Sequence, residues 1–125
     1  MFASDDLFNA LNISAITTLL DTYLTKPALY DAMVLPSEYT GQESINFYFD
    51  VPYDASLNYE VYSYTINCRS ETYIGSKTIA NTVIENINRK SYTDYYIICS
   101  VGVTIPPEDE TDNYNTPITA IIKKR

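Results

Sequence analysis

Histidine is absent from the 125 residues of this chain. It is the commonest general base and the commonest metal ligand in proteins, so its absence excludes Ser-His-Asp, Cys-His and His-metal sites. The chain also has only three glycines, Gly41, Gly75 and Gly102, and contains no glycine-rich phosphate-binding motif. Nucleotide binding through loops of that kind is therefore excluded as well.

Long hydrophobic runs are also missing. No stretch approaches the roughly 18 uninterrupted apolar residues that a membrane-spanning helix needs. The N-terminal residues include Asp5 and Asp6, where a secretory signal would carry Lys or Arg. We therefore expect neither secretion by that route nor a membrane span.

The chain has two cysteines, Cys68 and Cys99, and each stands inside an apolar, strand-like run. A thiol in such a run usually behaves as a small buried hydrophobic group. We expect both thiols to be free and buried, and a cross-strand disulfide is the alternative that the sequence leaves open.

Basic residues are scarce in the first half of the chain. Residues 1–60 contain nine acids and one base, Lys26, whereas residues 61–125 contain seven of each, which gives the net charge of −8. An acidic surface repels nucleic acid and lacks the Lys and Arg side chains that bind phosphate. We therefore expect no sequence-specific binding of DNA or RNA.

Acidic residues gather in a predicted loop over residues 106–115. They are Glu108, Asp109, Glu110 and Asp112. Such a loop could hold a divalent cation, but its spacing does not match an EF-hand, and a solvated acidic connection is the simpler interpretation. No acid stands in a predicted apolar pocket that would raise its pKa for glycosidase chemistry. The sequence thus predicts no cofactor, no metal and no enzymatic activity.

The hydrophobic pattern is that of a single domain over residues 1–125, a length that suits one core. Apolar residues recur at helical spacing in some segments and alternate with polar residues in others. The predicted helices cover residues 4–25, with a point of division at 12–14, and residues 71–89. The predicted strands cover residues 44–51, 57–69, 94–104 and 116–123, with a short additional strand near 32–35 and a turn at 52–56.

Strands outnumber helices in this order, and short loops between strands favour antiparallel pairing. We therefore expect an α+β fold, a two-layer sandwich with a mixed or antiparallel sheet of four or five strands and two helices packed on one face. The strand at 57–69 is partly apolar on both faces, which predicts a central position.

Tyrosine is abundant, with thirteen residues, and tryptophan is absent. Tyr48, Tyr62, Tyr64 and Tyr96 lie on predicted strands, where the ring packs and the hydroxyl stays wet. Tyrosine is enriched at protein interfaces for that reason, although strands favour aromatic residues in any case. For the set as a whole we favour contacts between subunits.

The order of the elements carries a further indication. A short helix over Leu7–Leu20 precedes the aromatic strand Ser44-Ile45-Asn46-Phe47-Tyr48. The strand from Tyr62 to Arg69 then leads into the helical segment from Ser76 to Val83, and a tyrosine-rich strand follows. In this arrangement residues 7–125 resemble the small tail-terminator or tail-completion proteins of bacteriophages.

The resemblance implies a homo-oligomeric ring, hexameric in that family, at the head-proximal end of the virion tail. Such a ring binds the last ring of tail-tube protein and a head-side connector, while DNA passes through its lumen; it has no catalytic residues. On this basis contacts with neighbouring subunits, the tube, the head or the lumen are expected of Tyr48, Tyr62, Tyr64, Tyr96, Glu108, Asp109, Glu110 and Asp112.

Three other interpretations remain. The first is a different structural protein of the head-to-tail junction, such as a stopper or a connector subunit with another copy number. The second is a monomeric module that binds a protein or a small ligand in a groove between helix and sheet. The third is an enzyme, which would need a carboxylate with a strongly perturbed pKa in a cleft.

Overall fold

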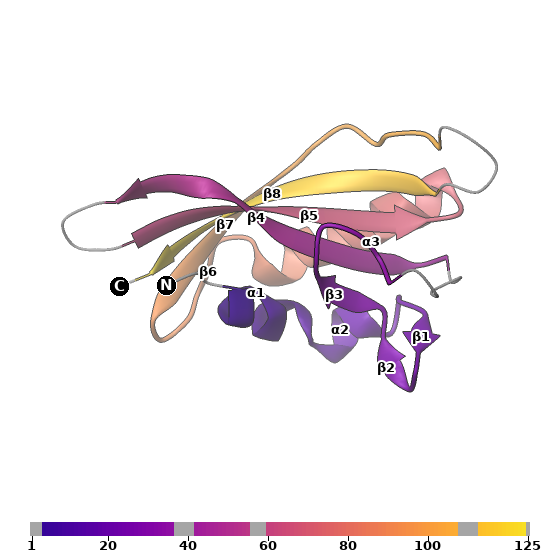
Figure 1. Ribbon diagram of the computed structural model, residues 1–125, viewed down its shortest axis with the longest axis horizontal. Coiled ribbons are helices and arrows are strands. Elements are labelled where there is room, and N and C mark those ends of the chain that lie inside the picture. Colours follow the sequence, from indigo (N-terminus) through magenta and orange to yellow (C-terminus); the bar gives the residue numbers. More distant parts are fainter. Residues whose placement is uncertain (1–3, 37–41, 56–59, 108–112, 125) are drawn as a thin grey trace.

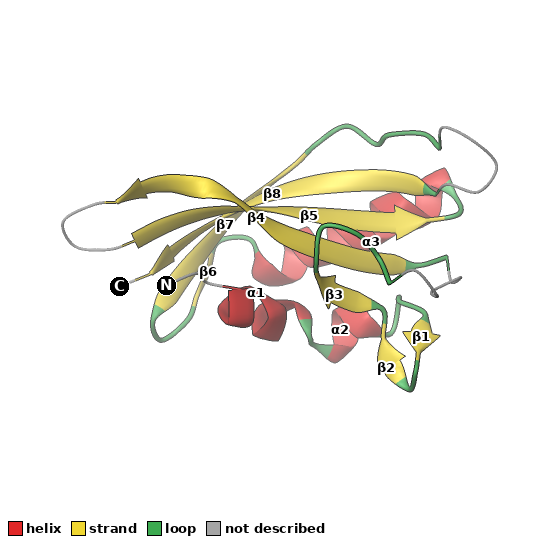
Figure 2. Cartoon of the chain, in the orientation of Figure 1, coloured by secondary structure: helices red, strands yellow, loops and turns green. Residues whose placement is uncertain are grey.

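The computed structural model describes residues 4–36, 42–55, 60–107 and 113–124. These residues form two layers, with the helices on one face of a six-stranded sheet (Figures 1 and 2). The expected α+β class is confirmed, although the sheet has more strands than the four or five predicted.

The described elements follow one another in the order helices, short strands, long strands, helix and strands. The helices are α1 (Ser4–Leu11), α2 (Ser14–Thr17) and α3 (Tyr73–Ile87). The strands are β1 (Thr22–Tyr23), β2 (Lys26–Pro27), β3 (Leu29–Asp31), β4 (Ser44–Ala55), β5 (Glu60–Ser70), β6 (Lys90–Ser91), β7 (Tyr95–Val101) and β8 (Tyr114–Lys124).

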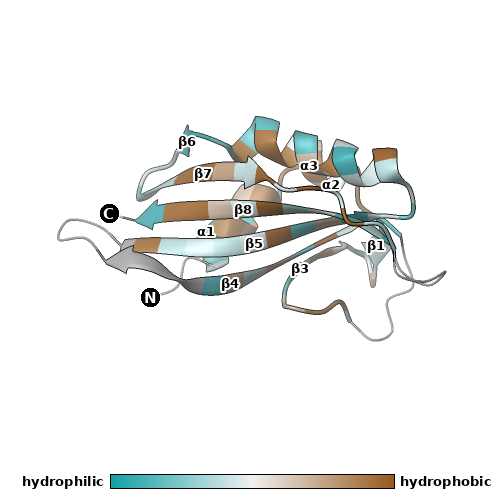
Figure 3. Cartoon of the chain, turned by 90° about the horizontal axis from the view of Figure 1, so that it is seen from above, coloured by the Kyte–Doolittle hydropathy of each residue, from teal (hydrophilic) through white to brown (hydrophobic). Residues whose placement is uncertain are grey.

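The large sheet has the strand order β3-β4-β5-β8-β7-β6, which Figure 3 shows from β3 at one edge to β6 at the other. Neighbouring strands are antiparallel except β3 and β4, which are parallel and pair Leu29 with Ile45. The sheet is therefore mixed, and β5 is central as its sequence predicted. The strands β1 and β2 form a separate hairpin.

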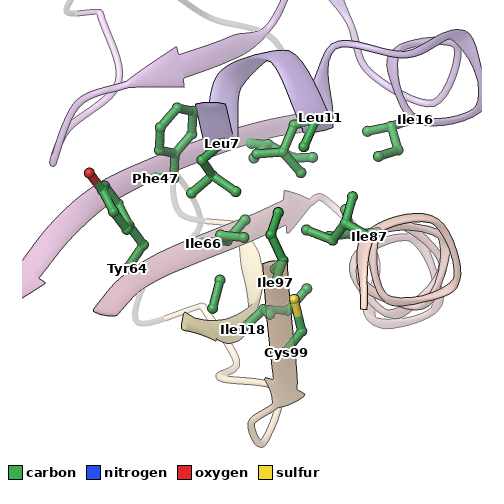
Figure 4. Close-up of a cluster of buried hydrophobic side chains, with 14 of the residues drawn as sticks. Leu7, Leu11, Ile16, Phe47, Tyr64, Ile66, Ile87, Ile97, Cys99 and Ile118 are labelled. Carbon is green, nitrogen blue, oxygen red and sulfur yellow. The ribbon is translucent and has the colours of Figure 1, made fainter. Parts of the chain in front are cut away.

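The core lies between the sheet and the helices. On β5 the side chains of Tyr64, Ile66 and Cys68 have no exposed surface, and they pair across the strands with Ala120, Ile118 and Thr116 of β8. Figure 4 shows Leu7 and Leu11 of α1 and Ile87 of α3 directed into the same cluster. Burial of this continuous apolar layer is the main favourable contribution to folding.

The helix α3 begins where its sequence places a cap. The Thr72 side chain accepts a hydrogen bond from the Gly75 N–H at 2.9 Å, which satisfies one of the free donors of the first turn. A Cβ atom on Gly75 would collide with Ser70 Oγ and would lie 2.7 Å from Thr72 Oγ1. Glycine therefore permits a close approach that any side chain would block. The buried stripe of the helix contains Ile79, Val83 and Ile87.

The prediction of one helix over residues 4–25 is wrong beyond Thr17. The chain divides near the predicted point at residues 12–14 and then forms the β1–β2 hairpin, whose turn has φ of 51° at Leu24 and 68° at Thr25. Hydrogen bonds to residues distant in sequence stabilise this course of the chain. The Asp21 carboxylate accepts the N–H groups of Gln42 and Glu43, and the Asp21 N–H donates to the Glu43 carbonyl at 2.9 Å.

Several strand boundaries also differ from the prediction. The short strand is at Leu29–Asp31 and not at 32–35. The strand β4 continues to Ala55 through the predicted turn at 52–56. Bulges near Val51 and Asp54 accommodate Pro52, and no described strand pairs with the β3-side edge of β4 at that point. The strand β7 ends at Val101 and not at residue 104.

Candidate assembly surfaces

Two of the four tyrosines predicted to contact neighbouring subunits lie inside the core. Tyr64 has no exposed surface and Tyr62 is 7% exposed, because both face the helices. The Tyr64 ring packs edge-on against Phe49 at 5.5 Å between centroids, and its hydroxyl lies 2.9 Å from Ser4 Oγ. Their burial argues against direct contact between either ring and a neighbouring subunit, and corrects that expectation.

Tyr48 and Tyr96 lie on the other face of the sheet, which no described helix covers, and both are half-buried. Tyr48 on β4 pairs with Thr65, and Tyr96 on β7 pairs with Lys123. The strands β5 and β8 separate them, so the structure does not bring these two rings together. They stand towards opposite edges of one open face.

The four predicted acids Glu108, Asp109, Glu110 and Asp112 lie outside the described residues. The segment that precedes them, residues 102–107, is described, and we call it the strap. It runs along the start of β8, above the sheet in Figure 1. The Gly102 N–H donates to the Pro117 carbonyl at 2.7 Å, and Ile105 exchanges backbone hydrogen bonds of 2.7 and 3.0 Å with Asn115.

Side-chain hydroxyl groups also connect the strap to β8 and, through β8, to α3. Thr104 Oγ1 lies 2.9 Å from Thr116 Oγ1, which in turn lies 2.8 Å from Ser76 Oγ on α3. Although its backbone is anchored in this way, the strap presents Val103 at 85% exposure and Ile105 at 50%. Apolar side chains this exposed, close together on an anchored segment, are typical of a surface that another molecule covers.

The sequence prediction missed the strap because the alternation of Val101, Val103 and Ile105 continues that of the preceding strand. The signal that could have revealed it is Gly102, an interruption that is typical of a strand end.

A surface pocket of about 480 Å³ lies beside β3, at the opposite edge of the sheet. It is lined by Phe8, Asn12, Lys26, Pro27, Leu29 and Tyr30. Its wall is mostly apolar, with Lys26 as its cationic group. The sequence did not reveal this pocket because Lys26 and Pro27 were assigned to the end of a long helix.

The two thiols are free and buried, as expected. Cys68 lies on β5 and Cys99 on β7, with β8 between them, so their separation across two strand spacings is too large for a disulfide. Burial raises the pKa of both thiols, that of Cys99 to about 12. Neither is therefore an activated nucleophile.

The two ends of the described chain meet beside Tyr95. Lys124 Nζ lies 2.8 Å from the Asp6 carboxylate, and the Tyr95 hydroxyl donates to the Asp6 carbonyl at 3.2 Å. The Tyr95 ring stacks on Tyr92 at 4.5 Å. Burial, with smaller contributions from Tyr92 and Asp6, raises the pKa of Tyr95 to about 12. These contacts fix α1 against the end of β8.

Asp31 has its pKa raised by burial and by the nearby Asp5 charge. Within the described ranges, no group of three or more Cys, Asp or Glu residues is arranged to hold a metal ion. No described helix has the length and hydrophobicity needed to cross a membrane.

Comparison with known proteins shows a fold likeness. No family model matches the chain, and no curated protein matches it in sequence. Among solved structures, the fold is similar to that of a chain described as "Virion of native gene transfer agent (GTA) particle". The TM-score is 0.66 at 13% sequence identity, and the match covers 94% of this chain and 90% of the other. The two chains therefore share an overall fold.

Proposed function

We propose that this chain is a structural virion protein of a bacteriophage or phage-like particle, and that it acts as a tail terminator or tail-completion protein. The observation that carries the proposal is the fold shared over 94% of the chain with a component of a gene transfer agent virion. The order of helices and strands supports the same family, because it resembles tail-completion proteins independently of that match.

In the proposed role the chain forms a homo-oligomeric ring, hexameric as in the family it resembles, at the head-proximal end of the tail. One face of the ring binds the last ring of tail-tube protein and the other binds a head-side connector. The net charge of −8 suits a lumen through which DNA passes, since like charge does not hold the polymer.

The shape of the domain suits such a ring. Its two sheet edges differ, β3 with β4 on one side and β6 with β7 on the other, so a contact that joins the β3 edge of one copy to the β6 edge of the next is heterologous. Heterologous contacts generate closed rings when the rotation between neighbours closes. In that arrangement Tyr48 and Tyr96, towards opposite edges of the open face, are the two of the four predicted tyrosines that remain available to the contact.

The mass of the purified protein across a concentration series tests the proposal. Light scattering coupled to size exclusion should show a species six times the 14.2 kDa chain, alone or after addition of tail-tube protein from the same particle. A matched sample without tube protein separates intrinsic assembly from assembly on the tube. Electron microscopy should then show the ring at one end of each tube.

Other outcomes identify the alternatives. A ring with another copy number that binds the head-side protein and ignores the tube indicates a stopper or a connector. A monomer at every concentration that ignores both partners overturns the proposal. It would favour a monomeric binding module, and the pocket beside β3 would then be the place to look for its ligand.

A further inference from the structure

We infer that the pocket beside β3 receives the strap of a neighbouring copy of this chain, so that the two features form the contact between subunits. This inference rests on the proposed ring. It commits to one occupant, the strap (residues 102–107) of a second copy, and it follows from the shape, the chemistry and the placement of the two features.

The pocket has the size and lining for a short apolar segment. An apolar cavity of about 150 Å³ can hold a benzene molecule, and this pocket has about 480 Å³, enough for more than one aliphatic side chain. Phe8, Pro27 and Leu29 supply apolar walls, and Lys26 adds a charge at one place in the lining. Such a site suits an apolar peptide that carries negative charge at one end.

The strap has the matching chemistry. Val103 and Ile105 are 85% and 50% exposed, and Pro106 is also exposed. Backbone hydrogen bonds to Pro117 and Asn115 already order the segment, so little conformational entropy is lost when another molecule binds it.

Charge supports the same pairing. In sequence the strap is followed directly by acids, beginning at Glu108, whereas Lys26 is the single base among residues 1–60. An apolar segment that leads into carboxylates therefore complements an apolar pocket with a lysine in its lining.

The topology excludes the same chain as the occupant. The strap follows β7 and is hydrogen-bonded to the start of β8, whereas the pocket lies beside β3. The strands β4 and β5 separate β3 from β8 (Figure 3). A strap held in this place does not lie in its own pocket, so the occupant that we infer is the strap of the next copy. Repetition of this contact joins each subunit to two neighbours, as a ring requires.

Cross-linking tests the contact directly. The variant Lys26→Cys/Val103→Cys places one thiol at the pocket and one on the strap, and both positions are exposed. The native Cys68 and Cys99 are buried, so a bismaleimide reagent reaches the new thiols first. Under the conditions in which the unmodified chain assembles, we expect a ladder of cross-linked species up to the full copy number.

Three control variants are needed to interpret the ladder of cross-linked species. Each single variant, Lys26→Cys or Val103→Cys, can give at most a cross-linked dimer. The variant Lys26→Cys/Asn81→Cys joins the pocket to the exposed side of α3 instead, and it should give no ladder. If the unmodified chain assembles and the two double variants cross-link equally, the inference is overturned and the proposed ring stands. If the chain assembles under no condition, both are overturned.

A second test of the inference compares the assembly of two variants and needs no cross-linking reagent. The variant Val103→Asp would bring a carboxylate into the apolar pocket, and should raise the concentration for half-assembly at least about tenfold. Ile74→Asp is the matched control, because Ile74 is 75% exposed and lies outside the strap, and it should change that concentration less than about twofold. Equal effects of the two substitutions would contradict the inference.

Discussion

The two faces of β5 are both largely buried, but different interactions bury them. On the inner face Tyr64, Ile66 and Cys68 pack against the helices and have no exposed surface. On the outer face Ser63 and Asn67 are 8% and 6% exposed, although no described helix covers them. Apolar burial under helices stabilises the fold through packing, whereas polar burial among neighbouring strands requires hydrogen bonds.

The outer face meets that requirement in part at one end of the sheet, where Asn46 and Asn67 are hydrogen-bonded but the buried Ser44 Oγ and Asn115 Oδ1 have no partner among the described residues. Arg69 Nε donates to Asn46 Oδ1 at 3.0 Å, and the Asn46 amide donates to the carbonyls of Ala32 and Met33 at 3.0 and 3.2 Å. Asn115 donates to Asn67 Oδ1 at 3.0 Å. The network fastens the segment after β3 to the sheet, and so helps to position the edge that carries the pocket.

The largest expected effect is on the free energy of unfolding, in a comparison of two adjacent residues that lie on opposite faces of β5. Ile66→Ala should lower the free energy of unfolding by about 2–5 kcal/mol, because it leaves a cavity in the core. Thr65→Ala removes an exposed hydrogen bond to Asp50 and should cost less than about 1 kcal/mol. Urea unfolding of both variants checks the difference, and equal losses would show that the faces do not differ as described.

The next effect concerns the polar network. Asn46→Ala removes the hydrogen bonds to Arg69, Ala32 and Met33 and should cost about 1–3 kcal/mol, because Asn46 is fully buried. Thr119→Ala, an exposed position on the same face, is the control and should change stability by less than about 0.5 kcal/mol. A neutral Asn46→Ala would mean that the buried network contributes little to stability.

The burial of Tyr95 on the inner face leads us to expect a loss of stability at high pH. The folded pKa of Tyr95, about 12, is above the ordinary value of 10.0, so folding favours the neutral phenol. The corresponding stability is fully present below pH 10 and is lost as the pH rises towards 12. The urea midpoint should fall over this range, and Tyr95→Phe should reduce that fall. An identical pH profile for the variant would rule out a contribution from Tyr95.

The smallest expected effect on stability belongs to a substitution that compares the reactivity of thiols on the two faces. Cys99 is buried and its neighbour in sequence, Ser100, is exposed on the other face. Ser100→Cys should change the free energy of unfolding by less than about 0.5 kcal/mol. It should add one thiol that reacts rapidly with a colorimetric thiol reagent, while Cys68 and Cys99 react only on unfolding. Fast reaction of three thiols in the native protein would contradict the burial of the inner face.

Local patterns in the sequence were sufficient for much of this fold. The alternation over residues 57–69 predicted a central strand, and the spacing of Ile79, Val83 and Ile87 predicted α3. In both segments the buried residues recur with the period of the strand or helix itself. The free state of Cys68 and Cys99 was likewise predicted from their apolar surroundings.

Tertiary contacts decided the remainder. Residues 18–25 have helical spacing, but hydrogen bonds between Asp21 and the residues just before β4 place them in a turn and a hairpin. Tyr62 and Tyr64 became core residues because the register of β5 directs them towards the helices. Val103 has the pattern of a buried strand residue and is exposed, because the strand ends before it.

The sequence by itself therefore determined the class of the fold, the central strand, the main helix and the absence of histidine chemistry, since each follows from composition or from a local period. Only the tertiary structure decided where the pocket and the strap lie, at opposite edges of one sheet. The physical reason is that a surface site is formed by residues from several elements, here Phe8, Lys26 and Leu29, and no local pattern encodes their meeting.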